Sequence, residues 1–209
     1  MTNTLHRQGT HESLSRDYVI FVTVAKGINH EGAGPKMQRF LRLAWEEGPV
    51  NIGTDKKNLI TAGGDVEKMI AGITHKSHPT AVFDNPEAIR RLVRKLKQED
   101  LGISVTISGL TDEVDEILRS EGIVRHSIEH SIGILGRTER LPTRQILELS
   151  SMCGHGCVSH NHVRKMIDWT KMAKLTPKQA ATYLARPCSC GAFNIARAEA
   201  LLTNAIEMA

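Results

Sequence analysis

The first clear pattern in the chain is a nearly continuous run of apolar, mostly β-branched residues, YVIFVTVA, at positions 18–25. Such a run predicts a strand that is buried on both faces of a sheet, as in α/β folds. A glycine-containing loop, KGINHEGAG, follows at residues 26–34. Apolar residues then recur at helical spacing, at Met37, Phe40, Leu41, Ala44 and Trp45. A helix is therefore predicted from Pro35 to the Gly48-Pro49 stop.

The middle of the chain continues to alternate between strand and helix patterns. TAVFD at 80–84 predicts a short strand, and Asn85 is expected to cap a helix that starts at Pro86. LGISVTISG, at 101–109, alternates apolar and polar positions and predicts a half-buried strand. A helix over 111–121 and a strand over 126–135, HSIEHSIGIL, complete the series. The alternation predicts an α/β protein with a small mixed or parallel sheet and flanking helices.

Beyond residue 138 the pattern indicates helices only. They are predicted over 143–152, 160–173, 176–186 and 194–207, and the third begins with a capping box at Thr176 and Gln179. We therefore expect a flexible N-terminus at 1–14, an α/β domain at 15–138 and a helical, cysteine-bearing C-terminal segment at 139–209.

Composition limits the classes of function. With 40% apolar residues among 209, the chain can bury a core without disulfides or metal, and its net charge of +4 is mild. That charge permits a small anionic ligand and does not favour nucleic acid. The N-terminus has no apolar signal region, and the longest apolar run is too short to cross a bilayer. We expect a cytoplasmic protein without a membrane partner.

The strongest chemical signal is the placement of the four cysteines, all within residues 153–190. They form two pairs, C-x3-C and C-x-C, on either side of two predicted helices. An antiparallel helical hairpin would bring the pairs together, and thiols of a cytoplasmic protein stay reduced. One shared metal site is therefore predicted, with the ligands Cys153, Cys157, Cys188 and Cys190.

The identity of the metal is open at this stage. An iron–sulfur cluster is the first interpretation, because clusters accept varied spacings and Pro187 stands beside a ligand. It would support redox or Lewis-acid chemistry on a small anionic substrate and handover of electrons to a redox partner. Structural zinc is the alternative and would suit a module that contacts nucleic acid or a partner protein. Ordinary buried thiols are the third reading, and a homo-oligomer is compatible with each.

Other residues are weaker candidates. His155, between two glycines, is predicted to act as an acid–base group, and His130 is either a core histidine or part of a pocket. Lys26, Gly32 and Gly34 would form an anion site after the first strand, although their loop matches no nucleotide-binding motif. The basic residues of 90–97 lack interleaved aromatics and are predicted to be a solvated helix face.

Overall fold

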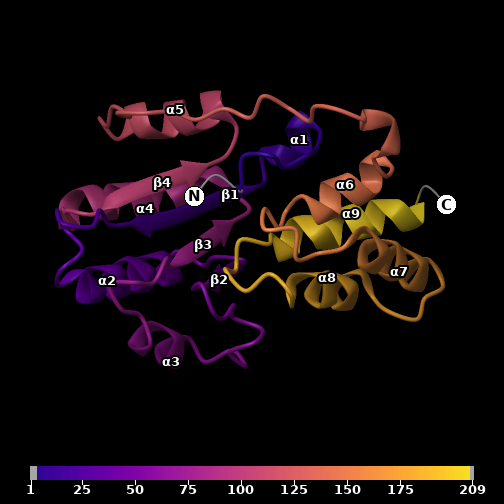
Figure 1. The fold of residues 1–209 in the computed structure, drawn as a ribbon, viewed down its shortest axis with the longest axis horizontal. Helices are drawn as coiled ribbons and strands as arrows, with labels where there is room; N and C mark the ends of the chain where they lie inside the picture. Colours follow the sequence, from indigo (N-terminus) through magenta and orange to yellow (C-terminus); the bar gives the residue numbers. More distant parts are fainter. Residues whose placement is uncertain (1–3, 208–209) are drawn as a thin grey trace.

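The computed structural model describes residues 4–207, and its centre is a four-stranded antiparallel sheet (Figure 1). The strands are β1 (Tyr18–Thr23), β2 (Asn51–Gly53), β3 (Thr80–Phe83) and β4 (Ser104–Ser108), in the order β2-β3-β1-β4. Ile20 of β1 lies opposite Ala81 on one side and Ile107 on the other. This strand order, with helices linking β1 to β2 and β3 to β4, is the split β-α-β arrangement of ferredoxin-like folds.

The predicted fold class is confirmed: a small sheet with flanking helices is followed by a helical segment that carries the cysteines. The strand pairs are antiparallel, and the parallel arrangement suggested by the apolar run does not occur. The run is nevertheless buried on both faces. Tyr18, Ile20 and Val22 enter one core, whereas Val19 and Phe21 enter another that they share with the C-terminal helices.

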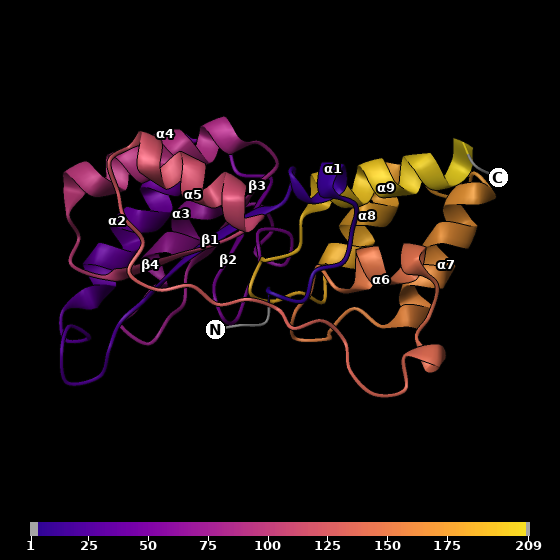
Figure 2. The ribbon, with the colours of Figure 1, turned by 90° about the horizontal axis from the view of Figure 1, so that it is seen from above.

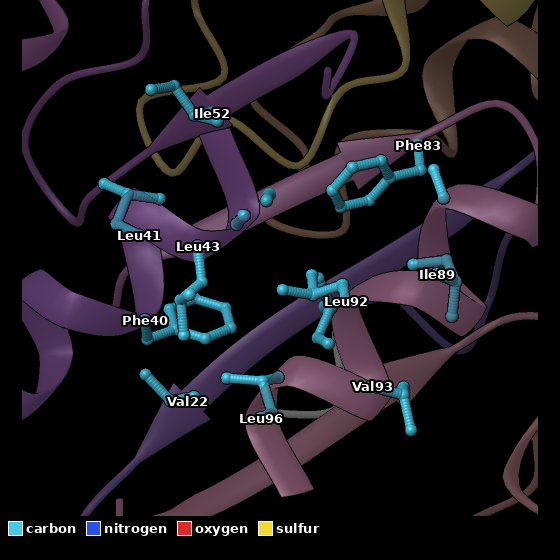
Figure 3. Packing of buried hydrophobic residues seen from close by; sticks show 14 of the residues in the cluster. Val22, Phe40, Leu41, Leu43, Ile52, Phe83, Ile89, Leu92, Val93 and Leu96 are labelled. Atoms are coloured by element: carbon cyan, nitrogen blue, oxygen red, sulfur yellow. The ribbon is translucent and has the colours of Figure 1, made fainter. Parts of the chain in front are cut away.

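The first core lies between the sheet and the helices α2 (Ala33–Glu46) and α4 (Pro86–Glu99) (Figure 3). Phe40 and Leu92 project from these helices towards Val22 and Phe83, and all four side chains are buried. Each large apolar side chain buried in this way contributes about 1.5–3 kcal/mol. As predicted, Asn85 caps α4: its side chain accepts a 2.9 Å hydrogen bond from the Ala88 backbone N–H.

The exposed basic row of α4 is paired with carboxylates of neighbouring elements. Arg91 contacts Glu47 at 2.7 Å, and Arg94 contacts Glu121, just beyond α5 (Thr111–Ser120), at 2.8 Å. Lys95 contacts Glu46 at 2.8 Å. This is the solvated face expected from the sequence, and its salt bridges, which the sequence did not predict, leave it no free cationic surface.

The helical segment lies beside the sheet (Figures 1 and 2). It comprises a short turn, η1 (Thr138–Arg140), and the helices α6 (Arg144–Ser150), α7 (His160–Lys171), α8 (Pro177–Ala185) and α9 (Ile195–Glu207). The capping box of α8 forms as predicted. The second core joins these helices to Val19, Phe21 and Val82 of the sheet. No helix in the described part of the chain is long and apolar enough to span a membrane.

Four short elements were not predicted from the sequence, and one predicted strand was wrong. The unpredicted elements are β2, α3 (Val66–Ala71), α1 (His11–Leu14) and η1. Residues 126–135 form no strand and connect α5 to η1 as an exposed, irregular segment, with Ile132 80% exposed. Gly133 and Gly136 have φ values of 84° and 92°, which break the extended backbone that a strand requires.

Candidate metal centre

The structure brings the two predicted cysteine loops together. The Sγ atoms of Cys188 and Cys190 lie 3.7 Å apart, and His155 Nδ1 lies 3.7 Å from Cys190 Sγ. Cys153, from the other loop, hydrogen-bonds to Cys188 and to Cys157. The five side chains therefore form a continuous series from His155 through Cys190, Cys188 and Cys153 to Cys157.

The contacts in this series are pairwise. Within residues 4–207, no group of three or more His, Cys, Asp or Glu side chains is arranged to hold a metal ion as it stands. Binding of a metal by the four cysteines therefore stays a prediction.

The helical hairpin predicted from the sequence produces this proximity. α7 begins three residues after Cys157, with Ser159 as its N-cap, and α8 returns the chain to Cys188. Each cysteine loop is closed by a tight turn: Gly156 N–H donates to the Cys153 carbonyl and Gly191 N–H donates to the Cys188 carbonyl, both at 3.0 Å.

The second cysteine loop is fixed against the edge strand β2. The side-chain amide of buried Asn58 lies within 2.9–3.1 Å of the carbonyl oxygens of Ala185, Arg186 and Cys188. The two backbones also approach each other closely: a Cβ atom on Gly53 would collide with the Cys190 carbonyl group. Glycine is required here because it has no Cβ.

The N-terminal segment ties the two loops to each other. The Arg7 guanidinium donates to the carbonyl of Met152, directly before Cys153, at 3.0 Å. It also donates to the carbonyl of Ala192, which follows the second loop, and pairs with Asp17. Asp17 forms a second ion pair, with Arg197, at 2.7 Å. The side chains of Arg7, Asp17 and Arg197 are almost completely buried. Burial of these charges is tolerable only because each is paired.

Hydrogen bonds within the cluster divide the thiols into two types. Hydrogen bonding with Cys188 lowers the pKa of Cys153 to about 5 and the pKa of Cys190 to about 6. The same hydrogen bonds, followed by burial, raise the pKa of Cys188. Partial desolvation and the charge of Cys153 raise the pKa of Cys157. Hydrogen bonding with Cys188 therefore favours the thiolate forms of Cys153 and Cys190, which are the forms that bind a metal ion.

A cavity of about 440 Å³ opens beside the first cysteine loop. Cys153, Gly154 and Gly156 form one side of it. The other lining residues are polar His6, Gln8, His160 and the serines 150, 151 and 159, together with apolar Ile134, Leu147 and Val158.

The other predicted site residues lie elsewhere. His130 is exposed on the irregular connector and lines a separate groove of about 1010 Å³ along β4. Lys26 and Gly32 belong to the loop between β1 and α2, and Gly34 lies in the first turn of α2. This loop is at the end of the sheet away from the helical segment (Figures 1 and 2). A single cleft shared by Lys26 and His155 is therefore not formed.

The side chains of Asn29 and His30 in the β1–α2 loop are engaged in hydrogen bonds, and Asn29 Nδ2 also donates to the Gly102 carbonyl at 2.9 Å. Asn29 Oδ1 accepts from the Ala25 N–H at 2.8 Å, and His30 Nδ1 accepts from the Gly27 N–H at 3.0 Å. These bonds close the turns of the loop itself.

Sequence reasoning missed the residues that hold the cysteine loops. Asn58 follows KK in a polar stretch without any motif, and Arg7 lies in the segment that was expected to be flexible. The sequence contains no signal for these residues, because both are far from the cysteines along the chain and approach them only in the folded structure.

Comparison with known proteins gives no relative. No family model matches the chain, and neither a curated protein nor a solved structure gives a significant match.

Proposed function

We propose that this is a zinc-binding protein in which the four cysteines coordinate one ion at the junction of the sheet and the helical segment. The observation that carries the proposal is the 3.7 Å separation of the Cys188 and Cys190 sulfurs. Zinc–sulfur bonds of about 2.3 Å in a tetrahedron place sulfur atoms roughly 3.8 Å apart. The remaining cysteines continue this close-contact series through Cys153.

An iron–sulfur cluster is the second candidate. Backbone N–H groups hydrogen-bond to Cys153 and to Cys190, as is common around cluster sulfurs. In a four-iron cluster, however, each cysteine binds a different iron, so the cysteine sulfurs stand apart by the width of the cluster. The close contact between the Cys188 and Cys190 sulfurs therefore disfavours a four-iron cluster, whereas a two-iron cluster, in which two cysteines bind the same iron, fits it as a single ion does. Redox chemistry on a small anionic substrate is the function of this second candidate.

Zinc at this position would hold the fold together. Cys188 and Cys190 belong to the loop fixed against β2, whereas Cys153 and Cys157 precede α7. An ion that binds both loops would join two parts of the chain that are distant in sequence, and its binding free energy would add to the folding free energy. Contact with nucleic acid has less support, because the basic row of α4 is already paired with carboxylates.

Metal analysis of the purified chain tests the proposal. We expect about one zinc per chain, and loss of that zinc in Cys153→Ser, Cys188→Ser and Cys190→Ser variants. His130→Ala and His160→Ala serve as controls, because both residues are exposed and His130 lies outside the cluster. Iron with acid-labile sulfide in a brown protein would select the second candidate. Metal-free protein after zinc and iron supplementation, or equal metal content in all variants, would overturn the metal site.

A further inference from the structure

The four cysteines differ sharply in how they are held. Cys153, Cys188 and Cys190 are 3%, 0% and 6% exposed, whereas Cys157 is exposed to solvent. Cys188 and Cys190 belong to the loop that Asn58 and Gly53 hold against β2. Cys153 is followed by a loop, residues 154–157, that is exposed throughout. Three ligands are thus built into the core, and the fourth is carried by a surface loop.

The loop that carries Cys157 has room to move. Gly156, which precedes Cys157, has a φ of 69° and no atom within 4 Å of the position where a Cβ would stand. Gly191 of the second loop has a similar φ of 71°, but a Cβ there would collide with the backbone of Ile52. Displacing Cys157 therefore disturbs few packed atoms, whereas displacing Cys188 or Cys190 would disturb the sheet edge.

We propose that Cys153, Cys188 and Cys190 are the permanent ligands of the zinc ion and that Cys157 is a replaceable ligand, which gives way to a small thiol. This inference rests on the zinc site proposed above. Zinc sites that bind exogenous ligands use three protein ligands and keep the fourth position open to solvent or substrate. Here the three buried thiolates would remain on the zinc ion, and the fourth position would open when the exposed Cys157 thiolate dissociates from it.

The cavity beside Cys153 gives access to the loop that carries Cys157; of the four cysteines, only Cys153 lines it. It borders Cys153, Gly154 and Gly156, so its contents lie next to the loop that Cys157 would vacate. At about 440 Å³ it is in the size range of small-molecule sites. Its lining combines serine and histidine residues with apolar Ile134, Leu147 and Val158, which suits a small thiol that has both apolar and polar atoms. A zinc ion with three thiolate ligands favours a fourth soft ligand.

The exchange is a balanced ligand substitution. The bond from zinc to Cys157 Sγ breaks, and a bond from zinc to the sulfur of the incoming thiol forms. The proton that the incoming thiol loses is taken up by the Cys157 sulfur, so the charge at the metal does not change. No electron is transferred, and the incoming sulfur is held as a thiolate, which is the nucleophilic form.

Cobalt(II) substitution with visible spectroscopy tests this inference, because cobalt bound by thiolates is coloured whereas zinc is silent. We expect Cys157→Ala to keep about one cobalt per chain with affinity within roughly tenfold of the parent, a loss near 1.4 kcal/mol. Adding 2-mercaptoethanol should shift its spectrum towards that of the four-thiolate parent. Ethylene glycol, which has oxygen in place of the sulfur, is the control and should leave the spectrum unchanged.

Cys188→Ala is the matched variant and should lose cobalt, because Cys188 is completely buried between two other thiols. Loss of cobalt from both Cys157→Ala and Cys157→Ser, with circular dichroism unchanged, would overturn the inference while leaving the zinc site in place. Retained cobalt that does not respond to 2-mercaptoethanol would overturn it as well. A parent chain that binds no cobalt or zinc would instead remove the zinc site on which the inference rests.

Discussion

At the scale of single residues, two glycines decide how closely the cysteine loop approaches the sheet. Gly53 ends β2 and Gly191 follows Cys190, and each would place a Cβ inside the backbone of the other's segment. Neither glycine belongs to a recognisable motif in the sequence. Their role follows only from the contact of two backbones that are far apart along the chain.

Gly191→Ala should destabilise the protein more than Gly63→Ala. Both glycines have a positive φ, 71° and 68°, so both variants incur the strain of a left-handed alanine, about 1–2 kcal/mol. Nothing lies within 4 Å of the Gly63 Cβ position, whereas the Gly191 Cβ would strike the backbone of Ile52. Overpacking of this kind costs about 1–3 kcal/mol more. Urea unfolding measures the difference, and equal free energies of unfolding for the two variants would contradict the close approach.

At the scale of elements, the sequence predicted those segments whose local capping and hydrophobic pattern match the structure that they adopt in the folded protein. α4 begins after Asn85, and α8 begins after Thr176, because these side chains cap the first turn in the folded protein. β2 was missed since three residues are too few to show a period. Residues 126–135 had the period of a strand, yet Gly133 adopts a left-handed backbone conformation and the isoleucines remain exposed.

The same distinction applies to the candidate site. The cysteine spacing and the helical hairpin were sufficient to predict that the two pairs meet. The residues that hold the two cysteine loops could not be predicted. Asn58, Arg7 and Asp17 are far from the cysteines in sequence, and only the tertiary fold brings them close.

Hydrogen exchange distinguishes the observed connector from the strand that the sequence suggested. Backbone amides of residues 126–135 should exchange rapidly, since the segment has no strand pairing and is exposed. Amides of β1, the central strand between β3 and β4, should be among the slowest in the protein. Mass spectrometry of peptic peptides gives both rates in one experiment. Protection of 126–135 comparable to that of β1 would show that these residues pair as a strand in solution.

At the scale of the whole molecule, a buried charge network joins the N-terminal segment, the sheet and the last helix. Asp17 directly precedes β1, Arg197 lies in α9, and Arg7 reaches the carbonyls beside both cysteine loops. The network and the second core together make the helical segment part of the same folded body as the sheet. Correct placement of the cysteines therefore depends on residues from both ends of the chain.

Asp17→Asn should be strongly destabilising. The substitution removes the only negative charge in direct contact with Arg7 and Arg197 among the ion pairs of the described residues. Leaving buried cations unpaired costs about 3–5 kcal/mol. Arg16→Gln is a control, because Arg16 is largely exposed and its ion pair with Asp84 is long, at 3.7 Å. Thermal unfolding should show a large decrease in Tm for the first variant only; a similar Tm for both would argue against a structural role for the network.

X-ray absorption spectroscopy of the zinc-loaded chain would identify the ligands of the ion, because it reports the atoms around it. We expect a single shell of about four sulfur atoms at roughly 2.3 Å from zinc, without iron in the sample. A first shell dominated by nitrogen or oxygen, or an iron signal with iron neighbours, would contradict a zinc ion bound by Cys153, Cys157, Cys188 and Cys190.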